Sequence, residues 1–81
     1  MASQPLSLGQ FIRERRLAAE LTQEQLAAKS GYSQPTISQW ERGSELPRLI
    51  HLSRLASLLG FDIGEAARLV QPEAEPSEPA A

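Results

Sequence analysis

The sequence predicts an all-α domain folded as a five-helix bundle, and three observations support this fold class. Apolar residues recur at spacings of three and four, which is typical of amphipathic helices, and no segment alternates as a strand does. Five segments have this apolar spacing. Serine, threonine or aspartate precedes four of them as an N-cap, and glycine follows three of them. A chain of 81 residues is long enough for one small domain with a small core.

The first predicted helix runs from Leu8 to about Ala19. Ser7 is a good N-cap, and Gln10 completes a capping box with it. Near the end of this helix lies a cluster of arginines, which either complements the helix dipole or contacts a phosphate backbone. The cluster consists of Arg13, Arg15 and Arg16.

The second and third predicted helices flank a tight turn within residues 22–43. Thr22 caps the second helix, which runs through Ser30, and Ser33 caps the third, which ends at Arg42. A glycine follows each helix, where a left-handed backbone conformation would end it. Four apolar residues have the spacing that would pin the two helices together. They are Leu26, Ala27, Ile37 and Trp40.

The fourth predicted helix has Pro47 at its first position and stops at Gly60. Seven apolar residues make it the most apolar element, so we expect it at the centre of the core. The fifth helix is expected over about residues 63–70, with Asp62 and Glu65 as its capping box.

These limits give a domain over residues 7–70, preceded by a flexible N-terminus over residues 1–6. Residues 71–81 hold three prolines, three glutamates and no large apolar group, so we expect a disordered acidic tail. The net charge is −2, but without that tail the eight basic residues outnumber seven acidic ones, which gives +1. So weak a charge predicts modest non-specific binding to nucleic acid with a shallow salt dependence.

The composition also excludes several classes of site. The chain has no cysteine, which rules out disulfides and thiolate metal sites. No apolar run approaches the ~20 residues that span a bilayer, and no signal-peptide pattern opens the chain, so we expect a cytoplasmic protein of a bacterium or its phage. His51, the only histidine, is assigned a surface or capping role rather than a metal role. Since no nucleophile motif or glycine-rich phosphate loop is present, we expect no enzyme activity, no metal and no cofactor.

The outer face of the third helix carries amide, hydroxyl and proline side chains where a surface helix normally carries lysine and glutamate. Ile37 defines the buried face, with Trp40 and Glu41 beside it, so Trp40 is assigned to the core rather than to base stacking. Glutamine, serine and threonine can bond to base edges in the major groove, and small apolar groups can contact the thymine methyl. The alternative is a polar, solvated helix. The candidate base-reading residues are Gln34, Pro35, Thr36, Ser38 and Gln39.

The spacing of this stretch resembles that of the phage repressor and Cro-like (XRE-type) helix-turn-helix family of transcriptional regulators. Counted from Gln23, the family has a small residue fifth, glycine ninth, and apolar residues fourth, tenth, fifteenth and eighteenth. The resemblance extends over about residues 8–70 and implies the lambda-repressor-like five-helix fold with double-stranded DNA as partner. The matching residues here are Leu26, Ala27, Gly31, Tyr32, Ile37 and Trp40.

The resemblance also implies roles for single residues. Arg16 and Glu41 match a pair that joins the first helix to the end of the recognition helix. Pro35 stands where relatives often carry a hydrogen-bonding side chain, so it would offer only apolar contact. The positions expected to contact DNA phosphates are Gln23, Ser33, Arg42 and Arg48.

The end of the chain carries more apolar residues than a terminal helix needs. Part of this set should close the core over the first helix, and the remainder should form a two-fold dimer contact, which would suit a repressor on a near-palindromic operator. The alternative for this set is that all of it serves the monomer core. The alternatives for the function are an antitoxin or restriction–modification controller that also binds a protein, or a protein-interaction module without DNA. The set consists of Phe61, Ile63, Leu69 and Val70.

Overall fold

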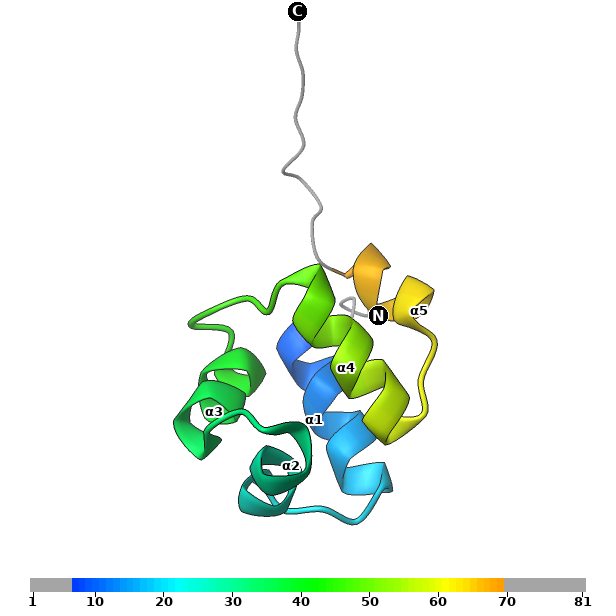
Figure 1. The fold of residues 1–81 in the computed structure, drawn as a ribbon. Helices are drawn as coiled ribbons and strands as arrows, with labels where there is room; N and C mark the ends of the chain where they lie inside the picture. Colours follow the sequence, from blue (N-terminus) through cyan, green and yellow to red (C-terminus); the bar gives the residue numbers. More distant parts are fainter. Residues whose placement is uncertain (1–6, 70–81) are drawn as a thin grey trace, which may run out of the picture.

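The computed structural model describes residues 7–69, which form five α-helices and contain no strand (Figure 1). The predicted all-α fold class is therefore confirmed. The expectations for residues 1–6, Val70 and the tail over residues 71–81 lie outside the described residues. The helices are α1 (Leu8–Ala18), α2 (Gln23–Ser30), α3 (Gln34–Arg42), α4 (Leu49–Leu59) and α5 (Ile63–Arg68).

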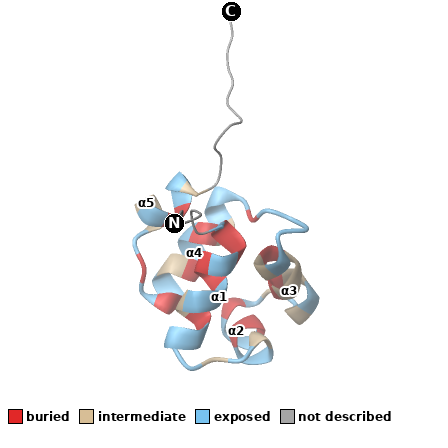
Figure 2. Ribbon diagram, turned by 180° about the vertical axis from the view of Figure 1, so that it is seen from behind, coloured by how far each residue is buried: buried red, intermediate tan, exposed pale blue. Residues whose placement is uncertain are grey.

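The core lies where the inner faces of the helices meet (Figure 2). Its largest fully buried side chains come from α1, α2, α3 and α4, so no single helix pair could form this core alone. α4 contributes two of them, which agrees with its predicted central position. These side chains are Ile12, Leu26, Ile37, Leu52 and Leu55.

Only part of the apolar content of α4 is buried. Its buried residues lie at one helical spacing and form a single stripe, while Leu49, Ile50 and Leu58 lie off that stripe and are 62%, 71% and 38% exposed. On α1, Leu17 is also exposed. Periodicity alone overestimates the buried face when a helix is apolar on more than one side.

Most helix ends follow the predicted local chemistry. The Oγ of Ser7 accepts from the backbone N–H of Gln10 at 3.1 Å, and the Oγ1 of Thr22 accepts from that of Gln25 at 3.0 Å. In both cases the glutamine side chain bonds back to the cap backbone, so both capping boxes are formed. Gly31, which ends α2, has the left-handed φ of 85° that places α3 across α2.

The two later helix starts differ from the prediction. Pro47 is buried in the loop before α4 rather than placed at its first position, and Arg48 is the N-cap residue. The Nδ1 of His51 accepts from the backbone N–H of Arg48 at 3.3 Å, which is the capping role considered for this histidine. At α5, Asp62 accepts from the backbone N–H of Gly64 at 3.4 Å and does not form the capping box expected with Glu65.

Gly9 lies where α1 meets the last turn of α3, a feature that the sequence analysis missed. A Cβ atom at this position would lie 2.5 Å from the carbonyl oxygen of Glu41 and 2.6 Å from that of Trp40. Both are backbone atoms that no rotamer change can move, so only glycine permits this approach of the two helices.

Gly9→Ala should therefore lower the free energy of unfolding by about 1–3 kcal/mol through overpacking. Alanine is the better helix former by about 1 kcal/mol, so a net loss would show that the contact outweighs propensity. Gly64→Ala is the control, because the nearest atoms to its Cβ belong to the flexible side chain of Asp62. Urea denaturation of both variants tests the prediction, which fails if Gly9→Ala is as stable as the parent.

Candidate nucleic-acid interface

α2 and α3 form a helix-turn-helix whose inner side is fixed by packing. All four residues that were predicted to pin the helices together are buried, and Ile37 and Leu26 have no exposed surface. Tyr32 packs from the turn, with its ring 5.2 Å from that of Trp40 in an edge-on arrangement. The outward side of α3 is therefore held at a fixed angle to the rest of the domain.

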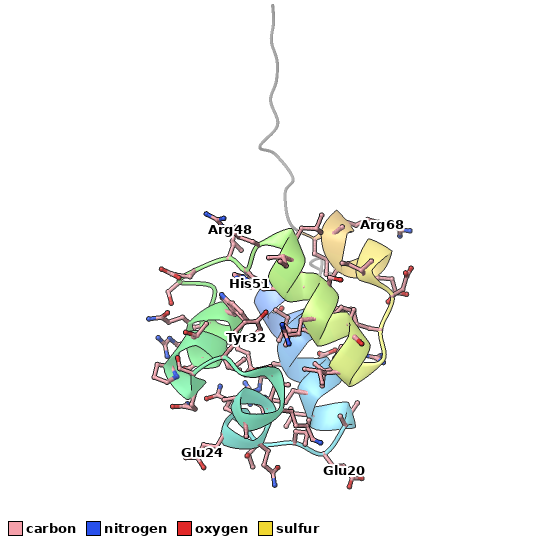
Figure 3. All side chains as sticks on the ribbon, in the orientation of Figure 1. Glu20, Glu24, Tyr32, Arg48, His51 and Arg68 are labelled. Carbon is pink, nitrogen blue, oxygen red and sulfur yellow. The ribbon has the colours of Figure 1, made fainter. Side chains whose placement is uncertain are left out.

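A small aromatic cluster joins α3 to α4. The ring of His51 stacks on Trp40 at 5.3 Å with an interplanar angle of 28°, and it meets Tyr32 edge-on at 5.1 Å (Figure 3). Trp40 is 4% exposed, so it belongs to the core and has no free face on which a base could stack. His51 thus serves packing and capping together.

The candidate base-reading residues share the solvent side of α3. Pro35 is exposed, and the remaining four are partly exposed. The hydroxyls of Ser33 and Thr36 lie 2.8 Å apart, and the Oγ of Ser33 also accepts from the backbone N–H of Thr36 at 3.2 Å. The start of α3 therefore presents hydroxyl groups that are already ordered.

The predicted phosphate contacts surround this side of α3. Arg42 lies along the helix and donates from Nη1 to the Oγ of Ser38 at 2.6 Å, and within residues 7–69 its other guanidinium nitrogens form no hydrogen bond. Arg48 is exposed and extends into solvent beyond the loop between α3 and α4 (Figure 3). Gln23 begins α2, and Ser33 caps α3, so both lie at helix N-termini, where backbone N–H groups favour anions.

Arg16 and Glu41 form a buried ion pair between α1 and α3. The Nε of Arg16 donates to the Oε2 of Glu41 at 2.7 Å, and its Nη2 donates to Oε1 at 3.1 Å. The Nη1 of Arg16 donates to the carbonyl oxygen of Leu21 at 2.7 Å. The two side chains are 8% and 4% exposed, so each charge depends on the other for compensation.

The ion pair continues into a chain of two glutamine amides. The Nε2 of Gln23 donates to the Oε1 of Glu41 at 3.0 Å, and the Nε2 of Gln34 donates to the Oε1 of Gln23 at 2.6 Å. Gln23 and Gln34 are the first residues of α2 and α3, so the fold brings these two helix starts together. Sequence reasoning assigned both residues to DNA but did not find this link, since their separation of 11 residues carries no signal.

Other kinds of site are not formed by the described residues. Residues 7–69 bring together no group of three histidine, aspartate or glutamate side chains that could hold a metal ion. None of their helices has the length and hydropathy that a membrane crossing requires.

The model of the family described as "Helix-turn-helix" matches residues 12–65. The chain belongs to the phage repressor and Cro-like helix-turn-helix family of transcriptional regulators. An uncharacterised HTH-type transcriptional regulator of Mycobacterium tuberculosis is 45% identical over 51 residues, which cover 63% of this chain and 36% of that protein. An uncharacterised HTH-type transcriptional regulator of Sinorhizobium fredii is 48% identical over 50 residues, which cover 62% of this chain and 64% of that protein. The chain therefore spans about one third to two thirds of these relatives.

Solved structures of this helix-turn-helix family have the same fold. The P22 c2 repressor in complex with a synthetic operator gives a TM-score of 0.70 at 31% identity, covering 79% of this chain and 94% of that one. The restriction–modification controller protein C.AhdI from Aeromonas hydrophila gives a TM-score of 0.68 at 36% identity, covering 73% of this chain and 86% of that one. Both matches extend beyond the helix-turn-helix, so the likeness includes the supporting helices.

Proposed function

We propose that this helix-turn-helix protein is a sequence-specific regulator of transcription that places α3 in the major groove of double-stranded DNA. The observation that carries the proposal is the outward side of α3, where neutral hydrogen-bonding side chains stand on a rigid, buried scaffold. Such groups match the donor and acceptor patterns of base edges. The likeness to a repressor bound to its operator supports the same orientation. The site of action is the cytoplasm, where bacterial DNA lies.

The residues divide into two roles in this proposal. Phosphate contacts fix the position of the protein on DNA, whereas base contacts set the preferred sequence. The phosphate contacts are assigned to Gln23, Ser33, Arg42 and Arg48. Base reading is assigned to Gln34, Thr36, Ser38 and Gln39, with apolar contact from Pro35.

Two substitutions should separate these roles. Gln39→Ala should relax the preference at one base pair by about 1–3 kcal/mol, because it removes a base contact. Arg42→Ala should weaken binding to all sequences together and reduce the salt slope by about one, because it removes a phosphate contact. Fluorescence anisotropy with the DNA upstream of the chain's own gene and with scrambled DNA, at two salt concentrations, measures both effects. Equal affinity of the parent for the two DNAs would contradict sequence-specific binding.

We further propose that the regulator binds as a homodimer and acts as a repressor by covering its operator. Phe61 belongs to the part of the predicted set that closes the core over α1, with its ring 5.0 Å from that of Phe11. Ile63 and Leu69 pack partly against the core. A dimer contact through α5 would therefore need additional apolar surface. The start of α4 lies beside the end of α5 in both ribbon views (Figures 1 and 2).

That additional surface is an exposed apolar patch at the start of α4. Leu46, Leu49 and Ile50 are 60%, 62% and 71% exposed, so they are available to a second copy of the chain. A two-fold dimer through this patch and α5 would present two recognition helices to half-sites about 10 bp apart between centres.

Ile50→Lys should raise the dissociation constant of the dimer by at least about tenfold, because burying an unpaired charge costs more than ~1.4 kcal/mol. Ala18→Lys, an exposed position at the end of α1 and outside the patch, is the control and should leave the dimer intact. Sedimentation equilibrium over a range of concentrations measures both constants. A parent protein that remains a monomer at high concentration would refute the dimer.

The likeness to C.AhdI favours one alternative, in which the regulator controls a restriction–modification system. A repressor and a restriction–modification controller both require specific DNA binding, and they differ in the gene that is regulated. Mapping the bound sites on the source genome distinguishes them, because a controller would occupy DNA beside a restriction gene.

A further inference from the structure

We propose that Arg42 and Arg48 form a basic edge that binds acidic peptide as well as DNA, and that its occupant in the absence of DNA is the acidic tail over residues 71–81 of the same chain. The inference rests on the proposed function, which assigns both arginines to phosphate contacts. It adds a regulator of those contacts, because DNA must displace the tail in order to bind.

The two arginines of the basic edge lie at the two ends of the loop between α3 and α4. Arg42 is the last residue of α3, and Arg48 is the N-cap residue of α4. Both are exposed, and Arg48 extends into solvent (Figure 3). A guanidinium group binds carboxylates and phosphates through the same planar pair of N–H groups, so an edge that suits phosphates also suits glutamates.

The charge of the basic edge is not compensated by the described residues. Within residues 7–69, the ion pair of Arg16 with Glu41 is the one that forms. Glu45 lies in the same loop as the two arginines, but its carboxylate is not within 4.0 Å of either guanidinium. The hydroxyl of Ser38, which accepts from Arg42 at 2.6 Å, brings no opposite charge. The basic edge therefore favours an anionic partner.

The acidic tail supplies negative charge within the same chain. It carries Glu73, Glu75 and Glu78 and no basic residue, whereas the rest of the chain carries eight basic residues and seven acidic ones. The sequence thus separates an excess of each sign into its two parts. Because the two parts are joined by a short linker, their effective concentration is about millimolar, at which weak ion pairs can form.

The acidic tail begins close enough to reach the basic edge. It follows the end of α5, which lies beside the start of α4 in both ribbon views (Figures 1 and 2). Glu73 and Glu78 stand four and nine residues after Leu69 in the sequence. An extended chain covers about 3.3 Å per residue, so these two residues can lie up to ~13 Å and ~30 Å from Leu69. A domain of this size is itself only roughly 25–30 Å across.

Competition for the same guanidinium groups follows from this arrangement. Exposed ion pairs are individually weak and are screened by salt, so the tail should reduce the affinity for DNA without abolishing binding. Because phosphate contacts are the ones displaced, the reduction should be the same for every duplex sequence. The preferred sequence should therefore be independent of the tail.

Neutralising the tail in the whole chain tests the competition. The triple variant Glu73→Gln, Glu75→Gln, Glu78→Gln keeps the length of the tail and removes its charge. Its dissociation constant for a duplex of about 20 bp with unrelated sequence should be about 2- to 10-fold lower than that of the parent at low salt. Fluorescence anisotropy measures this ratio, which should approach one as the salt concentration rises.

A matched control separates docking from a general effect of net charge. The triple variant Glu14→Gln, Glu20→Gln, Glu65→Gln changes the net charge by the same amount at exposed positions outside α3 and its flanking loops. Neutralising the tail should improve binding at least about twofold more than this control does. Equal binding by the two triple variants would overturn the inference, since charge alone would then explain the gain.

A second pair of backgrounds locates the docking surface. In Arg42→Gln, Arg48→Gln, neutralising the tail should improve binding no more than the control neutralisation does, because the basic edge is absent. In Arg13→Gln, Arg54→Gln, which removes two exposed arginines elsewhere, the difference between the two neutralisations should remain. A difference that persists without the basic edge would overturn the assignment of the tail to this surface.

NMR spectra of the DNA-free protein report the contact without relying on DNA binding. The backbone amide signals of residues 42–48 should differ between the parent and the tail-neutralised variant, and they should be the same in the parent and the control. These differences should not depend on protein concentration. Differences that appear only at high concentration would show that the tail of another copy binds, which would overturn docking within one chain.

The two readouts also separate the two proposals. A parent that binds no duplex contradicts the proposed function, whatever the NMR spectra show. A parent that binds DNA, but whose signals over residues 42–48 do not change when the tail is neutralised, contradicts only the docking of the tail.

Discussion

Arg16→Met should lower the free energy of unfolding by about 3–5 kcal/mol, because it leaves the carboxylate of Glu41 buried without its counter-charge. Most of that loss should return in the double variant Arg16→Met, Glu41→Leu, since replacing a buried pair by apolar groups of similar volume is often nearly neutral. Thermal and urea denaturation of the single and double variants measure both values.

The recovery should be incomplete, because Glu41→Leu also removes the acceptor of Gln23. Arg13→Met is the control: Arg13 is an exposed arginine on the same helix, and its replacement should change stability by less than about 0.5 kcal/mol. Equal destabilisation in the single and double variants would show that the charges are not coupled.

Trp40→Ala should cost about 3–5 kcal/mol, which is typical of removing a large aromatic residue from a core. Small domains have only about 5–15 kcal/mol of stability, so this one substitution should remove a large share of it. The loss includes the stacking on His51 and the edge contact with Tyr32, which link α3 to α4. Urea denaturation followed by circular dichroism gives the value without relying on the missing tryptophan signal.

The control for this variant is Leu17→Ala, which truncates an apolar side chain that is 51% exposed. It should change stability by less than about 0.5 kcal/mol. A Trp40→Ala variant that is as stable as this control would place the tryptophan outside the cooperative core.

Features that depend on neighbouring residues could be predicted from the sequence. The caps at Ser7, Thr22 and Ser33 use hydrogen bonds over three residues, so the local sequence is enough to find them. The glycine that ends α2 follows from a backbone requirement of the same local kind. The helix-turn-helix spacing also fixes which residues of α3 face inwards, and Ile37 and Trp40 are buried as expected.

Features that depend on tertiary packing could not be predicted. The preference of proline for a first helical position is local, but the buried packing of Pro47 in the loop overrides it. Which apolar residues of α4 are buried depends on the helices around it, so the apolar count alone could not show that Leu49 and Ile50 are exposed. The link between Gln23 and Gln34 exists only because two helix starts meet in space.

As the contact at Gly9 shows, the angle of α3 and its proposed sequence preference depend on different residues. Main-chain atoms of α1 and α3 meet there, so the angle of α3 does not depend on the side chains of its outer surface. If these residues read bases as proposed, substitutions at Pro35, Ser38 and Gln39 should exchange one preferred sequence for another on an unchanged support. Gln34 differs from them, because its amide is joined through Gln23 to the buried Glu41, so a substitution there also removes a hydrogen bond to the interior.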